Sequence, residues 1–400
     1  MDTARVCCKL SQLDISDWRK NISLHLPVAG AARPWLCREF SRPLLVVLPN
    51  SRFVRDFSAD ADSMRPFAEL PAVSVLPEIA IASYSDSSHI MEAQKAARGE
   101  VMDGWRAGGG ILLATPGALM GPVSLGGDRM ELACGPGVSR SFMLEWLHAH
   151  GYEKTDIVWT PGQFAYHGGI VDFFDPAYAW PVRVEFFDDD VESMRYFATD
   201  TQRSVGSFSR IEIRALASRR AVSIEDFFPS DAHVVLVEPS ELENAADSYS
   251  WLRAGVDGAG EDKALEWGDA ERFLALFPRV RLAASIARAE RGSGITGLPG
   301  FRGRMRDLEA YCLDVQRRGA VISLISEAEH FRDWGFGRGY QVSKGSVSEG
   351  FYDSSSKALF IGDLELSGVS VSAASSQARV PLDWGERLVH GQWAVHDDYG

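Results

Sequence analysis

Residues 161–197 read PGQFAYHGGIVDFFDPAYAWPVRVEFFDDDVESMRYF. Within this stretch, QFAYHGGIVDFF is typical of one bent strand or of a strand pair, with the bend at Gly168-Gly169. VRVEFF and VESMRYF are typical of two further strands, and the acidic DDD run between them has the composition of a turn. The pattern therefore predicts a small antiparallel meander.

The strand at 182–187 carries different chemistry on its two faces, because successive side chains of a strand point to opposite sides. We expect a core face that consists of Val182, Val184 and Phe186. We expect an outward face that consists of Arg183, Glu185 and Phe187. Two interpretations of the outward face stay open. It is either an Arg–Glu cross-strand pair on a solvated surface, or the guanidinium and aromatic ring of a protein interface.

Short apolar runs elsewhere predict a parallel sheet. Fully buried strands are expected at PLLVVLP (43–49), VSVLP (73–77) and ILLATP (111–116). SSHIMEAQKAARGEVMDGW (87–105) is typical of a helix between two of them. After the meander, the same alternation is expected to resume near RIEIRAL (210–216) and HVVLVEP (233–239), and again over 317–368.

SRSFMLEWLHAHGY (139–152), just before the meander, fits a helix closed by Gly151. Its apolar side is expected to consist of Phe142, Met143, Trp146 and Leu147. GVSVSAASSQARVP (368–381) is small and polar, as linkers are. The predicted fold class is α/β: a parallel-sheet domain interrupted by a small α+β insert and followed by a second small α/β domain.

Composition limits the classes of function. The chain has 55 acidic and 41 basic residues, a formal net charge of −14, and no Lys/Arg run longer than two residues. A protein that grips nucleic acid usually has a dominant basic patch, which this balance does not indicate. Five cysteines without a CxxC pair favour a reducing compartment, and the N-terminus has no secretory pattern. We therefore expect a soluble cytoplasmic protein that does not bind a membrane.

Carboxylates crowd the opening stretch, and paired carboxylates can serve as acid and base in glycoside hydrolysis. Most of them are expected in turns, where an aspartate caps its own backbone and needs no catalytic explanation. The set consists of Asp172, Asp175, Glu185, Asp188, Asp189, Asp190 and Glu192. We favour the structural interpretation and predict no catalytic residue and no metal site.

Nucleotide chemistry is also not indicated. A P-loop needs GxxxxGK[ST], and the nearest segment, LPVAGAARPWLCREF (26–40), lacks the lysine and the hydroxyl that follows it. In HVVLVEPSE, Glu238 lies between Val237 and Pro239, and the acid expected to hold magnesium at a strand end does not appear. Without these groups the charge that develops on a transferred phosphate has no stabiliser, so we expect no ATP hydrolysis and no cofactor.

The stretch from 161 to 204, which ends in TDTQRS, resembles the signature shared by the bacterial excinuclease B subunit and the transcription-repair coupling factor. Its skeleton is a Gly-Gly bend, an Ile-Val-Asp-Phe strand, Arg-hydrophobic-Glu-Phe-Phe, an acidic turn and Thr-Gln-Arg-Ser. RPLLVVLPNS, Arg98, ILLATPGALMGP and SIEDFFPSDAHVVLVEP resemble the flanks of that signature. Two features favour the N-terminal region of the coupling-factor (Mfd) family. The ATP-binding motifs are degenerate, and the last residues, GERLVHGQWAVHDDYG (385–400), resemble the entry of a polymerase-interacting domain.

This resemblance implies a division into four parts. It assigns 1–130 and 214–303 to a degenerate helicase-like domain, 131–213 to an inserted docking domain for the excinuclease A subunit, 304–372 to a small α/β domain, and 373–400 to a linker and the start of the RNA-polymerase-interacting domain. The motor that would translocate on double-stranded DNA with ATP, and most of the polymerase contact, would lie beyond Gly400. The chain itself would therefore be a binding module and not an enzyme.

The resemblance also implies roles for single residues. Arg183 and Phe187 occupy positions that the family uses against the excinuclease A subunit. His167 stands where the family has an arginine, so one charged contact is expected to be lost or to depend on pH. Arg195 and Arg203 stand at family arginine positions, where either could be structural. The candidate partner-binding residues are Arg183, Phe187, His167, Glu185 and Arg195.

The predicted function is recruitment of the excinuclease A subunit to damage-stalled RNA polymerase in transcription-coupled nucleotide excision repair. One alternative is an ATP-dependent, DNA-binding repair enzyme like the excinuclease B subunit. Another is a regulatory module whose docking face is masked inside a longer parent and is available only after rearrangement.

Overall fold

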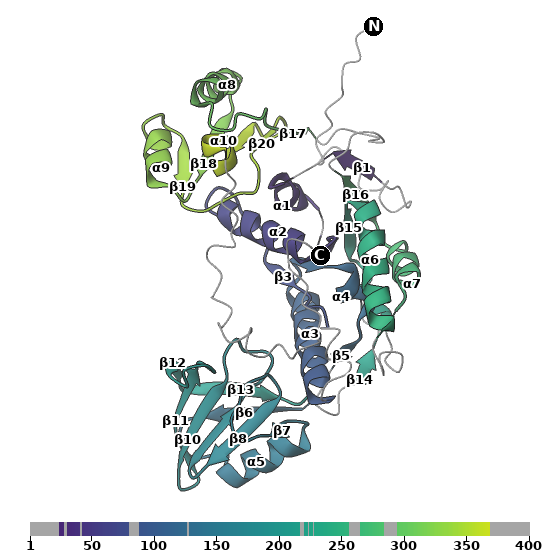
Figure 1. Cartoon of the computed structure of the whole chain (residues 1–400), viewed down its shortest axis with the longest axis vertical. Helices are drawn as coiled ribbons and strands as arrows, with labels where there is room; N and C mark the ends of the chain where they lie inside the picture. Colours follow the sequence, from purple (N-terminus) through teal and green to yellow (C-terminus); the bar gives the residue numbers. More distant parts are fainter. Residues whose placement is uncertain are drawn as a thin grey trace.

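A computed structural model describes three units of the chain (Figure 1). We name them the parallel-sheet unit, the antiparallel unit (residues 128–216) and the small unit (residues 294–368). The described residues are 24–27, 30–40, 42–79, 88–125, 128–216, 220–222, 224–226, 228–255, 265–283 and 294–368. The linker predicted at 368–381, apart from its first residue, and the segment 385–400 lie outside them. Among these described residues, no helix combines the length and the apolar character that crossing a membrane requires.

The parallel-sheet unit has six strands in the order β1-β16-β15-β2-β4-β3, and every neighbouring pair is parallel. The strands are β1 (Leu24–Pro27), β2 (Leu44–Val47), β3 (Val73–Val75), β4 (Ile111–Ala114), β15 (His233–Val237) and β16 (Arg279–Ala283). Runs of Val, Ile and Leu are buried on both faces of the central strands, as a sheet covered by helices requires. The α/β fold class is confirmed.

Helices cover both faces of this sheet. Helices α1 and α2 pack on one face, while α3, α4, α6 and α7 pack on the other. Their bounds are α1 (Ala32–Cys37), α2 (Ser51–Met64), α3 (Ser88–Gly108), α4 (Pro116–Met120), α6 (Pro239–Ala254) and α7 (Trp267–Leu274). Asn50 caps α2 and Thr115 caps α4 by accepting bonds from the main-chain N–H three residues on.

The strands predicted at 43–49, 111–116 and 233–239 are confirmed. The prediction of a fully buried strand at 73–77 is wrong, because β3 is the edge strand of the sheet. Only β4 flanks it, and the side chain of Val75 is 40% exposed. An apolar run alone does not distinguish an edge strand from a central one.

The antiparallel unit is built on a second six-stranded sheet, in the order β12-β11-β10-β9-β8-β7. Its strands are β7 (Glu153–Lys154), β8 (Gln163–His167), β9 (Ile170–Phe173), β10 (Val182–Phe187), β11 (Asp190–Phe197) and β12 (Ser204–Phe208). The predicted meander is confirmed, since β8 to β12 pair antiparallel in chain order. Helix α5 (Arg140–Ala149) buries Met143 and Leu147 against this sheet.

Two predictions about this unit are wrong. Phe142 does not belong to the buried side of α5, because its side chain is 53% exposed, and Trp146 is half-buried and stacks on His150. The α/β alternation does not resume at 210–216. Strand β13 (Arg210–Arg214) pairs antiparallel with β6 (Arg129–Ala133), 77 residues or more earlier in the chain, and closes the antiparallel unit.

The antiparallel unit leaves and rejoins the parallel-sheet unit through a two-stranded ribbon of β5 (Val123–Leu125) and β14 (Arg220–Val222). A short 3-10 helix, Ile224–Asp226, follows. Helix α3 runs alongside this connection (Figure 1). Its residues Ala93 and Ala96 pack in the core of the antiparallel unit, and Met102 and Trp105 pack in the core of the parallel-sheet unit. Helix α3 therefore joins the two units.

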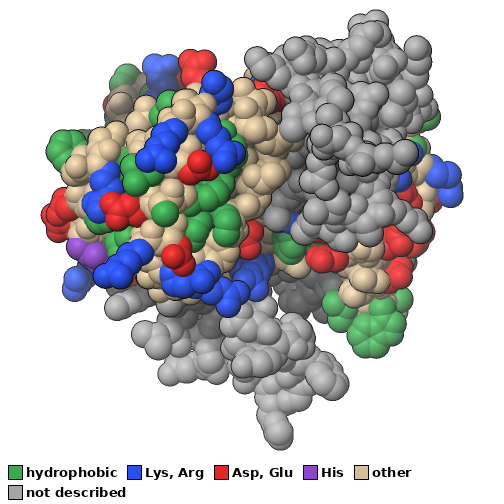
Figure 2. Space-filling view, turned by 90° about the horizontal axis from the view of Figure 1, so that it is seen from above, with side chains coloured by type: hydrophobic (Ala, Val, Ile, Leu, Met, Phe, Trp, Pro, Cys, Tyr) green, Lys and Arg blue, Asp and Glu red, His purple; other side chains and the backbone are tan. Residues whose placement is uncertain are grey.

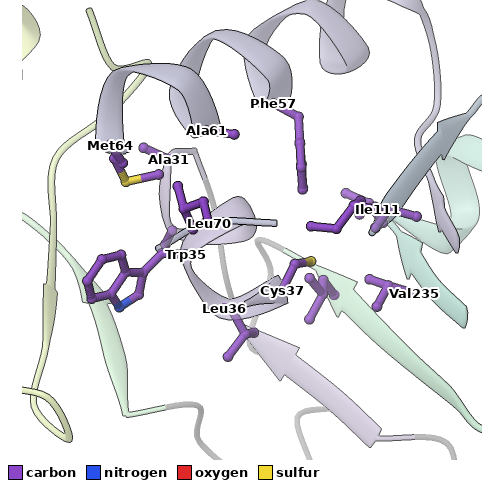
Figure 3. Packing of buried hydrophobic residues seen from close by; sticks show 14 of the residues in the cluster. Ala31, Trp35, Leu36, Cys37, Phe57, Ala61, Met64, Leu70, Ile111 and Val235 are labelled. Atoms are coloured by element: carbon purple, nitrogen blue, oxygen red, sulfur yellow. The ribbon is translucent and has the colours of Figure 1, made fainter. Parts of the chain in front are cut away.

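The small unit has five strands in the order β17-β20-β21-β18-β19. Its elements are β17 (Ile295–Gly297), α8 (Met305–Arg317), β18 (Val321–Ile325), α9 (Glu329–Phe336), β19 (Gln341–Ser343), β20 (Phe351–Asp353), β21 (Ala358–Ile361) and α10 (Asp363–Ser367). Trp35 of α1 packs on Phe351 and Phe360 and donates from Nε1 to Asp353 Oδ2 at 3.0 Å. Figure 3 shows Trp35 on the side of α1 that lies away from Ile111 and Val235 of the sheet. One hydrophobic core thus extends through both units.

A buried carboxylate completes this contact. Asp60 of α2 accepts from the main-chain N–H of Ser348 at 2.7 Å and from its hydroxyl at 2.7 Å. The Asp60 side chain is almost inaccessible, and this burial raises its pKa to about 7 in spite of the two hydrogen bonds, which lower it. The folded protein therefore keeps a proton on Asp60 at pH values where the unfolded chain has lost it.

The first prediction concerns this proton. An aspartate in the unfolded chain has a pKa of about 3.9, so the contribution of Asp60 to stability is fully present below about pH 4 and is lost as the pH rises to about 7. In the variant Asp60→Asn, the amide cannot ionise; its oxygen can accept from the main-chain N–H of Ser348, and its NH2 group can donate to the Ser348 hydroxyl oxygen. In urea denaturation across pH 4–7.5, the unfolding free energy of the wild type should fall relative to that of the variant. Parallel curves would contradict the assignment.

The second prediction concerns Arg98 of α3, which is fully buried. Its guanidinium donates to the carbonyl oxygens of Pro77, Ala118, Gly121 and Pro122, so one side chain ties α3 to the segment after β3, to α4 and to the residues that follow α4. Arg98→Met removes these bonds and should lower the unfolding free energy by about 3 kcal/mol or more. Arg106→Met is the control, because Arg106 lies on the same helix, half-exposed, 3.9 Å from Asp103, and should cost about 0.5 kcal/mol or less. Equal losses in denaturant titrations would contradict the assignment.

Candidate docking face

Strand β10 shows the predicted alternation. Val182, Val184 and Phe186 are buried in the core beneath α5. Arg183, Glu185 and Phe187 point to the opposite side of the sheet, which we name the outer face. An irregularity in the pairing with β11 falls between Glu185 and Phe186, and the turn that follows contains Asp188 with a positive φ of 54°. The end of β10 is thereby presented at the tip of a hairpin.

The β8–β9 hairpin brings His167 to the same tip. Gly168 has a φ of 59°, and a Cβ on Gly169 would lie 2.7 Å from the carbonyl oxygen of Phe186, so this turn requires glycine at the second position. His167 is exposed, and its Nε2 lies 3.0 Å from the carbonyl oxygen of Asp156. The histidine is therefore bonded to the loop before β8 when the protein is free.

Arg183 is held in place by several groups. Its Nε and Nη2 donate to the two carboxylate oxygens of Asp172 at 2.7 and 2.6 Å, and Nη2 also donates to Gln202 Oε1 at 3.1 Å. The guanidinium lies 4.6 Å from the centre of the buried ring of Phe197. The hydrogen bond to Asp172 is the main cause that raises the pKa of Arg183 above its ordinary value. Arg183 is thus a fixed cation at every physiological pH.

Glu185 and Arg195 form a second ion pair on the outer face. Arg195 Nη2 donates to Glu185 at 2.6 Å, and the hydroxyl of Ser193 donates to the other carboxylate oxygen at 2.6 Å. These two hydrogen bonds, that from Arg195 first, hold the pKa of Glu185 below its ordinary value. The predicted Arg–Glu cross-strand pair therefore exists, but its arginine is Arg195, and the partner of Arg183 is Asp172.

The side chain of Phe187 is strongly exposed, at 70%. It makes no ring–ring or cation–π contact among the residues that the structure describes. Arg203 is exposed as well, in the turn that leads into β12. The structure thus brings Arg183, Glu185 and Arg195 together in the middle of the outer face, and places Phe187 and His167 at its tip.

Sequence reasoning placed Asp172 in the Ile-Val-Asp-Phe strand but missed its role as the partner of Arg183. Asp172 lies within β9, nearly buried and in register with Arg183. Glu185, Asp190 and Glu192 also lie in strands, whereas Asp175, Asp188 and Asp189 lie in turns or at their edges. In the strand Ile-Val-Asp-Phe, Asp172 alternates with Val171 and Phe173 and therefore points to the outer face. This alternation was the signal in the sequence that could have identified Asp172. Its pairing with Arg183 also depends on the register of β9 against β10, and the sequence motif alone does not reveal that register.

The loop before β8 adds apolar surface that sequence reasoning also missed. Val158 is buried with Ala165, Phe174 and Phe197, so this loop packs on the outer face. On either side of Val158, the side chains of Ile157 and Trp159 are 49% and 42% exposed. The outer face therefore combines a neutralised polar centre with exposed apolar groups around it.

Residues 130–217 match the family described as the UvrB interaction domain. The whole candidate face, from Ile157 to Arg203, lies within this match. The chain also aligns over 247 residues with the transcription-repair-coupling factor of Mycobacterium bovis at 27% identity, and over 63 residues with that of Bacillus subtilis at 44%. The chain is related to the transcription-repair coupling factors.

These alignments cover only part of each coupling factor. The Mycobacterium bovis alignment covers 58% of this chain and 20% of its relative, and the Bacillus subtilis one covers 16% and 5%. The coupling factor of Escherichia coli is 31% identical over 108 residues, which are 26% of this chain and 9% of the relative. The chain thus corresponds to about a fifth or less of the length of these coupling factors, and it resembles their N-terminal region.

Proposed function

We propose that this chain is a docking module of transcription-coupled nucleotide excision repair, which binds the excinuclease A subunit and brings it to damage-stalled RNA polymerase. The observation that carries the proposal is the position of Phe187 and Arg183 on one exposed sheet face within the region that matches the UvrB interaction domain. Aromatic residues and arginine are both enriched at the cores of protein interfaces, and this face offers one of each.

The free protein supports this role because its polar groups are already paired. Arg183 and Arg195 are each neutralised by a neighbouring carboxylate, so the face does not expose isolated charges that a partner would have to desolvate alone. Phe187 and Ile157 are left to supply the apolar area. A preorganised face of this kind loses little conformational entropy on binding.

We also propose that the parallel-sheet unit is a degenerate helicase-like domain that does not hydrolyse ATP. Arg33 is the second residue of α1, near the place where a P-loop would carry its lysine. Its guanidinium donates to the carboxylate of Glu238 at 2.8 Å, and both side chains are about one-seventh exposed. Glu238 directly follows β15, at the strand end where the sequence predicted no metal-holding acid, and its carboxylate is paired with Arg33. Gly30, in the same turn, is covered by Glu349, whose Cβ lies 2.8 Å from where a Cβ on Gly30 would be. Two carboxylates, Glu238 and Glu349, thus lie against this turn, and their charge disfavours a phosphate there.

The alternative of a DNA-binding repair enzyme has less support. Seen from above in Figure 2, the small unit shows basic, acidic and apolar side chains interspersed. Several of its arginines are paired with acids, namely Arg304 with Asp307, Arg318 with Asp314 and Arg338 with Glu309. Paired charges of this kind release few counterions from nucleic acid and provide little affinity for it.

The third prediction tests docking by isothermal titration of this chain with the excinuclease A subunit. Phe187→Ala should weaken binding by tenfold or more, about 1.4 kcal/mol, because the ring is an exposed interface anchor. Its unfolding temperature should not change. Phe336→Ala is the control: Phe336 is 79% exposed but lies on α9 of the small unit, and the variant should bind like the wild type. Equal affinity of all three proteins would reject this face, and absence of wild-type binding would reject the function.

The fourth prediction concerns the nucleotide. Titration of the chain with a fluorescent ATP analogue and Mg²⁺ should give no saturable signal up to about 1 mM, because Arg33 is engaged by Glu238. Glu238→Ala frees Arg33 but supplies neither the lysine nor the hydroxyl, so it should not restore binding. Micromolar binding by the wild type would favour the enzymatic alternative.

A further inference from the structure

The fixed orientation of Arg183 has a specific consequence for its N–H groups. A guanidinium has five N–H donors: one on Nε and two on each Nη. Asp172 takes Nε and one donor of Nη2, and Gln202 takes the second donor of Nη2. Nη1 makes no hydrogen bond among the described residues and is not a buried atom. One edge of the guanidinium therefore remains available at the surface.

The groups that hold Arg183 are themselves fixed. Asp172 is nearly buried and lies directly opposite Arg183 across the β9–β10 ladder. Gln202 has a positive φ of 56°, and its amide donates to the carbonyl oxygen of Thr199 at 2.8 Å, which directs Oε1 at the arginine. Phe197 supports the guanidinium from below. A free arginine side chain loses rotamer entropy when a partner fixes it, whereas the side chain of Arg183 is already fixed in the free protein.

We propose that Asp172 is a positioning residue of the docking face, which orients Arg183 so that Nη1 faces the partner, and that the partner contributes an oxygen acceptor there, a carbonyl or a carboxylate. This inference rests on the proposed function. Because Asp172 neutralises Arg183, the partner oxygen does not need a charge of its own. Asp172 acts through Arg183 and does not itself contact the partner.

The fifth prediction is a double-mutant cycle, measured by titration with the excinuclease A subunit. Asp172→Asn keeps the shape of the side chain but puts an amide donor against the guanidinium, which releases Arg183. Arg183→Lys keeps the charge but cannot hold Asp172 and the partner with one fork. Each single variant should bind about tenfold more weakly than the wild type, and the double variant should also be about tenfold weaker, not about a hundredfold. A residue with an independent structural role would give multiplied effects.

Further variants make the outcome decisive. Gln202→Ala removes one acceptor of Arg183 and the bond to Thr199 but leaves the ion pair, and it should weaken binding about threefold with only a small loss of thermal stability. Glu131→Gln makes the same carboxylate-to-amide change in an exposed ion pair with Arg210 of the same unit, and should bind like the wild type. If Asp172→Asn and Gln202→Ala both bind within twofold of the wild type while Phe187→Ala does not, the proposed positioning role of Asp172 is wrong and the proposed docking function is retained. If the wild type does not bind, both proposals fall.

Discussion

Helix α3 belongs to two hydrophobic cores, and the arrangement of the antiparallel unit on the parallel-sheet unit depends on this. Its alanines fit against one core and its Met102 and Trp105 fill the other. Between these two contacts, the carboxylate of Glu100 lies 3.0 Å from the guanidinium of Arg214 and 3.4 Å from that of Arg129. These two arginines lie opposite each other in the register of β13 and β6, at one end of that ribbon. Two short connections alone would allow the units to turn against each other, whereas the shared helix restrains them.

The candidate docking face lies on this restrained unit, and the charges at its centre are paired with each other. Two arginines and two carboxylates cancel at its centre, in a chain whose formal net charge is −14. Such a face gives little electrostatic steering, so the rate of encounter with a partner should depend only weakly on salt at this point. On the proposed function, specificity would come from the shape of the hairpin tip and from the direction of one guanidinium edge.

The sequence predicts this face well where a local pattern determines the structure. Alternation in β10 separates Arg183 and Phe187 from the core residues, and the paired glycines predict the β8–β9 hairpin. Three central strands of the parallel sheet follow from their apolar runs. The sequence does not predict pairing between residues that are distant in the chain. Arg183 pairs with Asp172, and not with Glu185, because the register of β9 places Asp172 opposite it. In the same way, β13 pairs with β6 from the start of the unit. Edge position is equally hidden in the apolar run of β3.

The contact between α1 and the small unit has the longest sequence separation of these features. The indole of Trp35 and the carboxylate of Asp353 are 318 positions apart, and the core around Trp35 includes Phe360. During synthesis from the N-terminus, this core cannot close until Phe360 has left the ribosome, although α1 and α2 are made first. The antiparallel unit is nearly continuous in sequence and can fold as soon as β13 emerges. The side of α1 that carries Trp35 therefore stays uncovered until the small unit has been made, by which time the antiparallel unit can already be folded.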